Sequence, residues 1–123
     1  MKSACFLSVI IPAFNEAARL KKTLSVLREF LRQSDFTWEV VLADDGSEDG
    51  TSHVLQNIFT ENEFQIVRHE INCGKGYTIK QGVKAARGEI CLITDADFST
   101  PISEFNKLKT FLDQGYDIVI GSR

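Results

Sequence analysis

Short apolar blocks alternate along the chain with segments of helical periodicity. The blocks have the length of β-strands and cover residues 6–11, 38–43, 64–67, 90–94 and 116–120. Between the first two blocks, apolar side chains step by three or four residues, at Ala17, Leu20, Leu24, Leu27 and Leu31, and predict an amphipathic helix. Weaker stripes of the same period predict two more helices, around Ile79, Val83 and Ala86 and around Phe105, Leu108 and Leu112.

The order of these elements predicts the fold class. Strands that alternate with helices favour an α/β fold, with a mostly parallel sheet and helices on both of its faces. Local signals mark the helix ends: Asn15 is expected to cap the first helix, Thr100 before Pro101 to start the last one, and Gly115 to end it. In such sheets, ligands bind beyond the carboxyl ends of the strands.

The segments after the predicted strands hold most of the unusual polar chemistry. In chain order they read PAFNE, DDGSEDGT, HEINCGKG, DADFSTP and GSR. If the second and fourth strands flank the first, their aspartates converge on one crevice, namely Asp44, Asp45, Asp95 and Asp97. Like charges gathered there repel one another, and repel phosphates, unless a cation lies between them. Carboxylate ligands suit Mg²⁺ or Mn²⁺, which share their coordination shell with substrate phosphates and water.

These features also have plainer interpretations. Acidic residues after strands often cap the next helix or form Asx turns, and we expect Asp49 to be of that kind. The D-x-D spacing of Asp95 and Asp97 differs, because residues two apart in an extended segment point to the same side. Lys75 lies between glycines ahead of a helix, so it can bring a cation and bare amides to a phosphate, or it is a solvated lysine on a flexible turn.

Length and composition narrow the class of protein. The 123 residues support one domain, over residues 1–123. A formal net charge of −3 argues against a nucleic-acid binder, which needs a basic face. No apolar run reaches the roughly 18 residues of a membrane span, and the N-terminus does not look like a signal peptide, so we expect a cytoplasmic protein. Cys5, Cys73 and Cys91 lack CxxC spacing and are expected to be buried or idle thiols.

Five blocks of the sequence together resemble a known family. In order and spacing they are similar to the N-terminal nucleotide-sugar domain of family 2 inverting glycosyltransferases, which have the Rossmann-like GT-A fold. The blocks read SVIIPAFNE, VVLADDGSEDGT, NCGKGYTIKQGVKAARGEI, LITDADFSTP and YDIVIGSR and span residues 7–123. Within the family, the chain most resembles the polyprenyl-phosphate glycosyltransferases, meaning the dolichyl-phosphate mannose and glucose synthases and their bacterial relatives. This resemblance implies transfer of a hexose from a GDP- or UDP-linked donor to an acceptor such as a polyprenyl or dolichyl phosphate.

The resemblance also implies nucleotide-binding roles for residues that match the family's motifs. Pro12, Phe14 and Glu16 match the segment that embraces the nucleotide, with Phe14 in place of the commoner tyrosine. Asp44 and Asp45 match a pair of aspartates of which one contacts the base or the ribose.

Further roles are implied for the metal and the acceptor. Lys75 matches a lysine near the nucleotide, and Asp95 and Asp97 match the D-x-D motif that holds Mg²⁺ or Mn²⁺ on the diphosphate, Asp97 being the expected direct ligand. Arg123 matches an arginine implied to receive the acceptor phosphate, and a disordered terminal arginine is the alternative. Mannose synthases often have glutamine and histidine after D-x-D, where this chain reads STP, so the sugar stays open.

The resemblance sets expectations for the chain as a whole. Relatives continue with a strand that runs antiparallel between the fourth and fifth strands, and with parts that meet the acceptor and the membrane. We therefore expect this chain to be a truncated, donor-binding part, with peripheral association at the cytoplasmic face of a membrane through the missing part. Without that strand, residues 90–94 would form an open edge that favours pairing with another chain, for example in an edge-strand homodimer.

Two other classes of protein remain as alternatives. A receiver-type signalling domain has a similar length, five βα units and an acidic cluster, but its acidic pair follows the first strand, where this chain reads PAFNE. A non-catalytic interaction module that keeps the fold is the other alternative.

Overall fold

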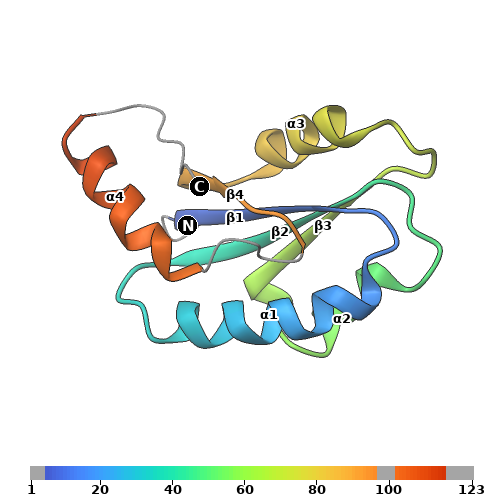
Figure 1. The fold of residues 1–123 in the computed structure, drawn as a ribbon, viewed down its shortest axis with the longest axis horizontal. Helices are drawn as coiled ribbons and strands as arrows, with labels where there is room; N and C mark the ends of the chain where they lie inside the picture. The colour runs from blue at the N-terminus through green and yellow to red at the C-terminus, as the bar shows by residue number, and fades with distance from the viewer. Residues whose placement is uncertain (1–4, 97–101, 116–123) are drawn as a thin grey trace.

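The computed structural model describes residues 5–96 and 102–115. They form a parallel four-stranded sheet with helices on both faces, which confirms the predicted α/β fold (Figure 1). The strands are β1 (Cys5–Ala13), β2 (Trp38–Asp44), β3 (Phe64–Arg68) and β4 (Gly88–Ile93). The helices are α1 (Ala17–Arg32), α2 (Thr51–Gln56), α3 (Lys75–Ala85) and α4 (Phe105–Asp113), with short 3-10 helices η1 (Glu61–Glu63) and η2 (Ile102–Glu104). The predicted strand 116–120 and the predicted helix start at Thr100 and Pro101 lie outside the described residues.

The strand order decides which loops meet. It is β3-β2-β1-β4, so the second and fourth strands flank the first, as the convergence of the aspartates requires. The loops after β1, β2 and β3 all lie at the right of Figure 1. A receiver domain has the order 2-1-3-4-5, whereas 3-2-1-4 is the order of doubly wound nucleotide-binding sheets. The receiver alternative is therefore wrong.

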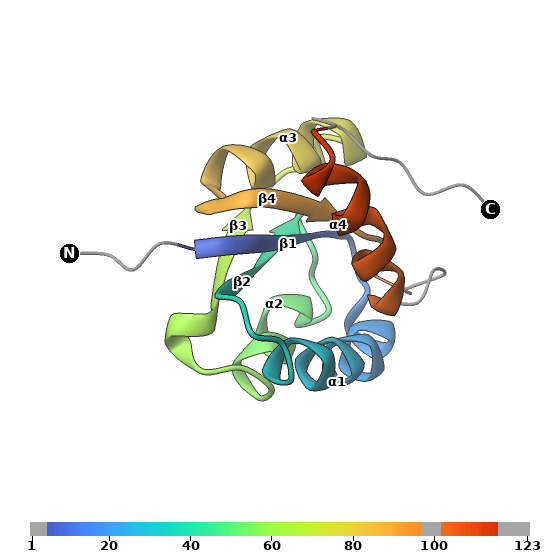
Figure 2. The ribbon, with the colours of Figure 1, turned by 90° about the vertical axis from the view of Figure 1, so that its left-hand side faces the viewer.

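The main core lies between the sheet and α1. Helices α1 and α2 cover one face of the sheet and α3 covers the other (Figures 1 and 2). The predicted stripe of α1 is confirmed, since all four of its leucines are fully buried, at Leu20, Leu24, Leu27 and Leu31. They pack with alternate side chains of β1 and β2, such as Val9 and Leu42. Burying each such side chain stabilises the fold by about 1.5–3 kcal/mol, so this layer holds the strands firmly in place.

Helix α4 packs near the amino end of β1 through aromatic side chains. Phe105 is buried and meets the ring of Phe36 edge-on, with centroids 5.9 Å apart, and Phe36 lies 5.3 Å from the ring of Phe6. The helix ends where predicted, because Gly115 takes φ +103° and its N–H donates to Leu112 O over 3.0 Å.

Helix α3 packs on the sheet through small residues. Thr78 and Gly82 are its buried positions, whereas Val83 is 41% exposed, so the predicted apolar stripe of this helix is wrong. The reason is a close approach of helix to sheet: a Cβ on Gly82 would lie 2.8 Å from Ile10 Cγ2 and 3.3 Å from Ala43 Cβ. Glycine lets the helix axis come near enough to the sheet to fix the position of the whole helix.

A buried polar network closes the amino end of the same layer. Glu39 is 1% exposed, and its Oε2 accepts hydrogen bonds from Ser8 Oγ (2.5 Å) and Arg87 N (2.6 Å). Its Oε1 accepts from Gln65 Nε2 (3.0 Å) and Arg87 Nε (3.2 Å). Burial alone would raise the pKa of Glu39, but these four hydrogen bonds together hold the pKa below its ordinary value. The carboxylate is thus ionised and fully partnered.

The outer edge of β4 bears on the remaining expectations. Strand β4 is the last strand of the described sheet beside β1, and Ile93 on it is 47% exposed. Pairing of this edge with another chain stays a prediction.

The three cysteines are free, and Cys73 and Cys91 are exposed rather than buried. None of the described helices combines the length and hydropathy needed to cross a membrane.

Replacing Gly82 with a larger residue tests the close packing of α3. We expect Gly82→Val to lower the free energy of unfolding by about 1–3 kcal/mol, because the new side chain overlaps the β1 methyl group. Gly76→Val on the same helix is the matched control, since nothing lies within 4 Å of a Cβ at that position. Urea unfolding followed by circular dichroism measures both variants, and equal losses would contradict this packing.

Replacing Glu39 with glutamine tests the buried network. We expect Glu39→Gln to lower the free energy of unfolding by about 3 kcal/mol. The amide nitrogen of the glutamine is itself a donor, and it would face donor groups whose hydrogen bonds the carboxylate oxygen accepts. The folded pKa of Glu39 lies below its ordinary 4.5, so ionised Glu39 stabilises the fold above that pH and the contribution is lost as pH falls through the folded pKa.

The variant should therefore show a flatter decline of stability in acid than the unchanged chain. Glu89→Gln, at an exposed position of β4, controls for the loss of one surface charge. Urea unfolding at several pH values between about 3 and 7 measures the difference, given the ordinary range of glutamate pKa values. An unchanged acid slope in Glu39→Gln would show that Glu39 does not contribute to the pH dependence.

Candidate functional site

A cavity of about 270 Å³ opens at the carboxyl ends of the strands. It lies between the loops that follow β1, β2, β3 and β4. Six of the seven residues predicted to bind the nucleotide sugar line it, namely Pro12, Phe14, Glu16, Asp45, Lys75 and Asp95. The structure therefore brings together side chains from four separate segments of the chain. Asp44, the seventh, does not line the cavity.

Asp45 ties the glycine-rich turn to the end of β2. Its Oδ1 accepts a hydrogen bond from Cys73 N (2.7 Å) and its Oδ2 accepts one from Gly74 N (3.0 Å). The two loops also pack closely at Gly46, which takes φ +87° and where a Cβ would meet His69 O at 3.3 Å. Asp45 is 5% exposed, so its carboxylate forms part of the cavity wall and fixes the turn that carries Lys75.

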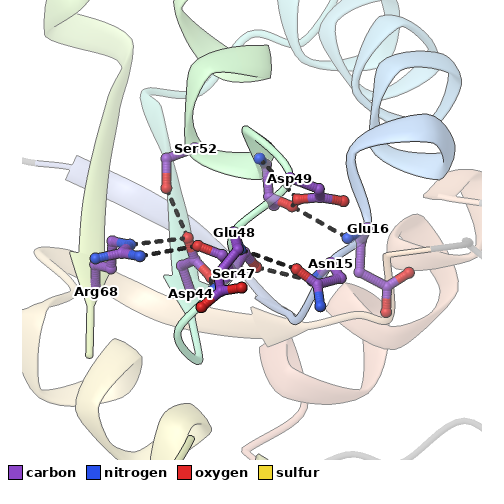
Figure 3. Close-up of polar contacts among 9 residues, drawn as sticks. Asn15, Glu16, Asp44, Ser47, Glu48, Asp49, Ser52 and Arg68 are labelled. Atoms are coloured by element: carbon purple, nitrogen blue, oxygen red, sulfur yellow. Dashed lines mark hydrogen bonds and ion pairs between the residues drawn. The ribbon is translucent and has the colours of Figure 1, made fainter. Parts of the chain in front are cut away.

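Asp44 is buried behind the rim and braces the loop after β2. Its Oδ1 accepts from Ser47 N (2.9 Å) and its Oδ2 accepts from Ser52 Oγ (2.7 Å), while Arg68 Nε lies 3.6 Å from Oδ2 (Figure 3). Of the two adjacent aspartates, Asp45 faces the cavity and Asp44 is fully enclosed. Which of them contacts a base or ribose stays a prediction, and the geometry favours Asp45.

The same loop caps the start of α1. Ala17 N donates to Asp49 Oδ2 (3.1 Å), and Asp49 also accepts from the backbone and hydroxyl of Thr51. The Thr51 hydroxyl lowers the pKa of Asp49, so the carboxylate stays ionised at the helix terminus. The expectation that Asp49 forms an Asx turn is confirmed by its hydrogen bond from Thr51 N, but the helix whose start it caps is α1 and not the next helix.

Asn15 does not cap α1, so that prediction is wrong. It adopts φ +52°, and its Oδ1 accepts from Glu48 N (2.9 Å) instead (Figure 3). Its own N–H donates to Ser47 Oγ (2.8 Å). The side chain thus points across to the β2 loop, and together with Asp49 it fixes the segment that carries Phe14 and Glu16.

Lys75 and Asp95 form an ion pair at the cavity. Lys75 Nζ donates to Asp95 Oδ1 over 2.7 Å, and the two side chains are 64% and 49% exposed. Lys75 is the first residue of α3, and Asp95 follows β4, so strand order brings the two loops together. The expected catalytic residues Asp97 and Arg123 lie outside the described residues.

The donor set at the cavity fits a hard divalent ion. Among residues 5–96 and 102–115, no group of three histidine, cysteine, aspartate or glutamate side chains has metal-site geometry. The Asp95 carboxylate is nevertheless half exposed at the cavity and already holds a cationic group. One or two carboxylates completed by substrate phosphates and water are what Mg²⁺ uses in such sites.

Two further polar residues among those described line the cavity and were not predicted from the sequence. Arg19 lines it and lies 3.6 Å from Glu16 Oε2, and Thr78 lines it from α3. The sequence feature that could have indicated Arg19 is its position one turn after Glu16, on α1. Among the described residues, Arg19 and Lys75 are the positive side chains that line the cavity, and Glu16, Asp45 and Asp95 are the carboxylates.

Comparison with known sequences identifies relatives of the chain. Residues 8–123 match the family described as "Glycosyl transferase family 2". The chain is 39% identical to a dolichyl-phosphate beta-glucosyltransferase of Trichomonas vaginalis, over 99% of this chain and 41% of that protein. The chain spans about two-fifths of the length of the curated relatives it matches.

Solved structures of other proteins share the fold of this chain. S. aureus TarS in complex with UDP-GlcNAc has a TM-score of 0.72 and 26% identity, over 89% of this chain and 31% of that one. A mannosyltransferase from Pyrobaculum calidifontis, in complex with GDP-Man and Mn²⁺, has a TM-score of 0.62 and 28% identity, over 78% of this chain and 28% of that one. The chain belongs to glycosyltransferase family 2, and its similarity to these solved structures shows that it has the GT-A fold.

Proposed function

We propose that this chain binds the nucleotide-sugar donor of a glycosyltransferase that transfers a hexose to a polyprenyl or dolichyl phosphate. The observation that carries the proposal is the meeting of Asp45, Lys75 and Asp95 around one cavity at the carboxyl ends of parallel strands. The Trichomonas relative is named for dolichyl phosphate and a glucosyl group, and the TarS structure holds a UDP-sugar. These names support a lipid phosphate as acceptor and a nucleotide sugar as donor.

The nucleotide has suitable partners among the residues that line the cavity. Phe14 is 45% exposed beside Pro12, so its ring offers an apolar surface to a base or ribose. Each Asp45 oxygen accepts one N–H from the turn, and a carboxylate has about four lone-pair sites, so it retains capacity for a donor on the base or ribose. Glu16 also lines the cavity.

The diphosphate is proposed to bind at the charged residues Lys75 and Asp95. Asp95 would hold a divalent ion there, with Asp97 as the expected direct ligand two positions later, and the mannosyltransferase structure supports Mn²⁺ as that ion. When bound, such an ion supplies Lewis acidity that offsets negative charge on the departing nucleoside diphosphate. The positive side chains at the cavity, Lys75 and Arg19, act in the same sense.

The reaction follows from the chemistry of donor and acceptor. An oxygen of the acceptor phosphate attacks the anomeric carbon from the face opposite the nucleotide, and the bond from that carbon to the β-phosphate oxygen breaks. The electron pair of the broken bond leaves with the nucleoside diphosphate, and the configuration inverts. The acceptor is already anionic, so the step needs no strong general base. Arg123 is proposed to bind the acceptor phosphate through paired N–H donors, at the cytoplasmic face of a membrane.

Calorimetry with nucleotides and sugar nucleotides tests this function. We expect UDP or GDP, and the matching UDP-glucose or GDP-mannose, to bind about tenfold more tightly with Mn²⁺ than without it, which corresponds to about 1.4 kcal/mol. Asp95→Asn should remove most of that metal dependence, because the amide carries no charge for the ion. Asp35→Asn, in the exposed segment after α1, is the matched control and should retain it.

The preferred base emerges from the same titrations. Absence of any nucleotide binding, with or without Mn²⁺, by a chain that unfolds cooperatively would contradict the proposal and favour a non-catalytic interaction module. Equal metal dependence in Asp95→Asn and Asp35→Asn would instead show that the ion binds elsewhere.

A further inference from the structure

The position of Lys75 is unfavourable for helix stability. Lys75 is the first residue of α3, an 11-residue helix, and the partial positive charge of a helix lies at its amino end. A lysine there is repelled by the helix dipole, whereas an acidic residue would be stabilised. The pairing of its ammonium with Asp95 at 2.7 Å offsets this repulsion. Lys75 is therefore placed to hold an anion at this spot.

The Asp95 carboxylate is likewise placed to hold a cation. It is 49% exposed at the cavity, and the ammonium of Lys75 lies against its Oδ1. The carboxylate of Asp45 differs, because both of its oxygens accept backbone N–H groups and it is 5% exposed. Asp45 could exchange its partners only if the backbone of the glycine-rich turn changed. Asp95 can exchange its cation without any change in the backbone of a loop.

We propose that Lys75 is an internal substitute for the divalent ion, and that donor binding exchanges the two cations. Without a donor, the ammonium of Lys75 neutralises Asp95. When the donor binds with its metal ion, Asp95 would exchange the ammonium for the ion, and the ammonium of Lys75 would pair with the diphosphate. This inference rests on the proposed function and adds that metal binding and nucleotide binding depend on each other through one side chain.

The exchange is physically easy in both directions. Both side chains are more than 40% exposed, and an exposed ion pair contributes little free energy because water and salt screen it. Lysine carries a point charge on a flexible four-carbon stem, so its ammonium can move while α3 stays in place. The helix itself is fixed by the close packing of Gly82 on the sheet. The side chain, and not the fold, therefore makes the change.

Lys75→Met should have effects of opposite sign on the two ligands. Binding of Mn²⁺ alone should become about two- to fivefold tighter, because an exposed ion pair of this kind no longer competes with the ion. Binding of UDP or GDP with saturating Mn²⁺ should become about tenfold weaker, because a cation that pairs with the diphosphate is lost. Electron paramagnetic resonance of free Mn²⁺ measures the first effect and calorimetry the second.

Lys80→Met is the matched control, since it removes one positive charge from an exposed position of the same helix. It should leave both affinities within about twofold, as expected for a screened surface charge. In an Asp95→Asn background, Lys75→Met should no longer change the Mn²⁺ affinity, because the competition takes place at Asp95. Lys75→Arg should keep the competition, because it keeps the charge.

The outcomes separate this inference from the proposed function. Unchanged or weaker Mn²⁺ binding in Lys75→Met would overturn the exchange, even if nucleotides bind as proposed. An effect of Lys75→Met that persists in Asp95→Asn would overturn it too. If the unchanged chain binds no nucleotide, the proposed function fails, and tighter Mn²⁺ binding in Lys75→Met would still show that the ammonium competes for Asp95.

Discussion

Negative charges gathered at one edge of a parallel sheet must each be offset, and this electrostatic constraint organises the rim of the protein. Asp44 is offset by Ser47, Ser52 and Arg68 and holds the loop after β2 from inside. Asp45 is offset by two backbone amides and joins that loop to the glycine-rich turn. Among the described residues, Asp95 is offset by the exposed side chain of Lys75. Asp44 and Asp45 thus hold loops in place, whereas the partner of Asp95 is one that a ligand can replace.

Helix α3 links the core to this rim. It packs closely on the sheet at Gly82, where the absence of a side chain allows the approach to Ile10 and Ala43. A rigid helix then places its first residue, Lys75, at the cavity. The same helix therefore combines a tightly packed middle with a charged amino end that helix stability alone would not favour. The middle of α3 therefore contributes to stability, and its first turn carries the residue proposed to bind a ligand.

The two ends of the sheet differ in the same way. At the amino end, Glu39 is buried, and four hydrogen bonds from the protein already occupy its carboxylate oxygens. At the carboxyl end, the charges of Lys75 and Asp95 are exposed to solvent and weakly paired. Membership of glycosyltransferase family 2 is consistent with this division, since parallel α/β sheets bind ligands at the carboxyl ends of their strands. The buried network keeps the strands in register, and the exposed pair is available for a donor.

The sequence by itself determined most of the described strands and helices, the fold class and the edge of the sheet at which the candidate site lies. Hydrophobic periodicity and strand-helix alternation are local properties, and parallel strands necessarily bring their carboxyl ends to one edge. Only the tertiary structure decided which neighbouring aspartate faces the cavity, that Asp49 and not Asn15 caps α1, and that Arg19 lines the site. It also decided the pairing of Lys75 with Asp95. These contacts join loops far apart along the chain, and the direction of a loop side chain depends on backbone angles that residue spacing does not specify.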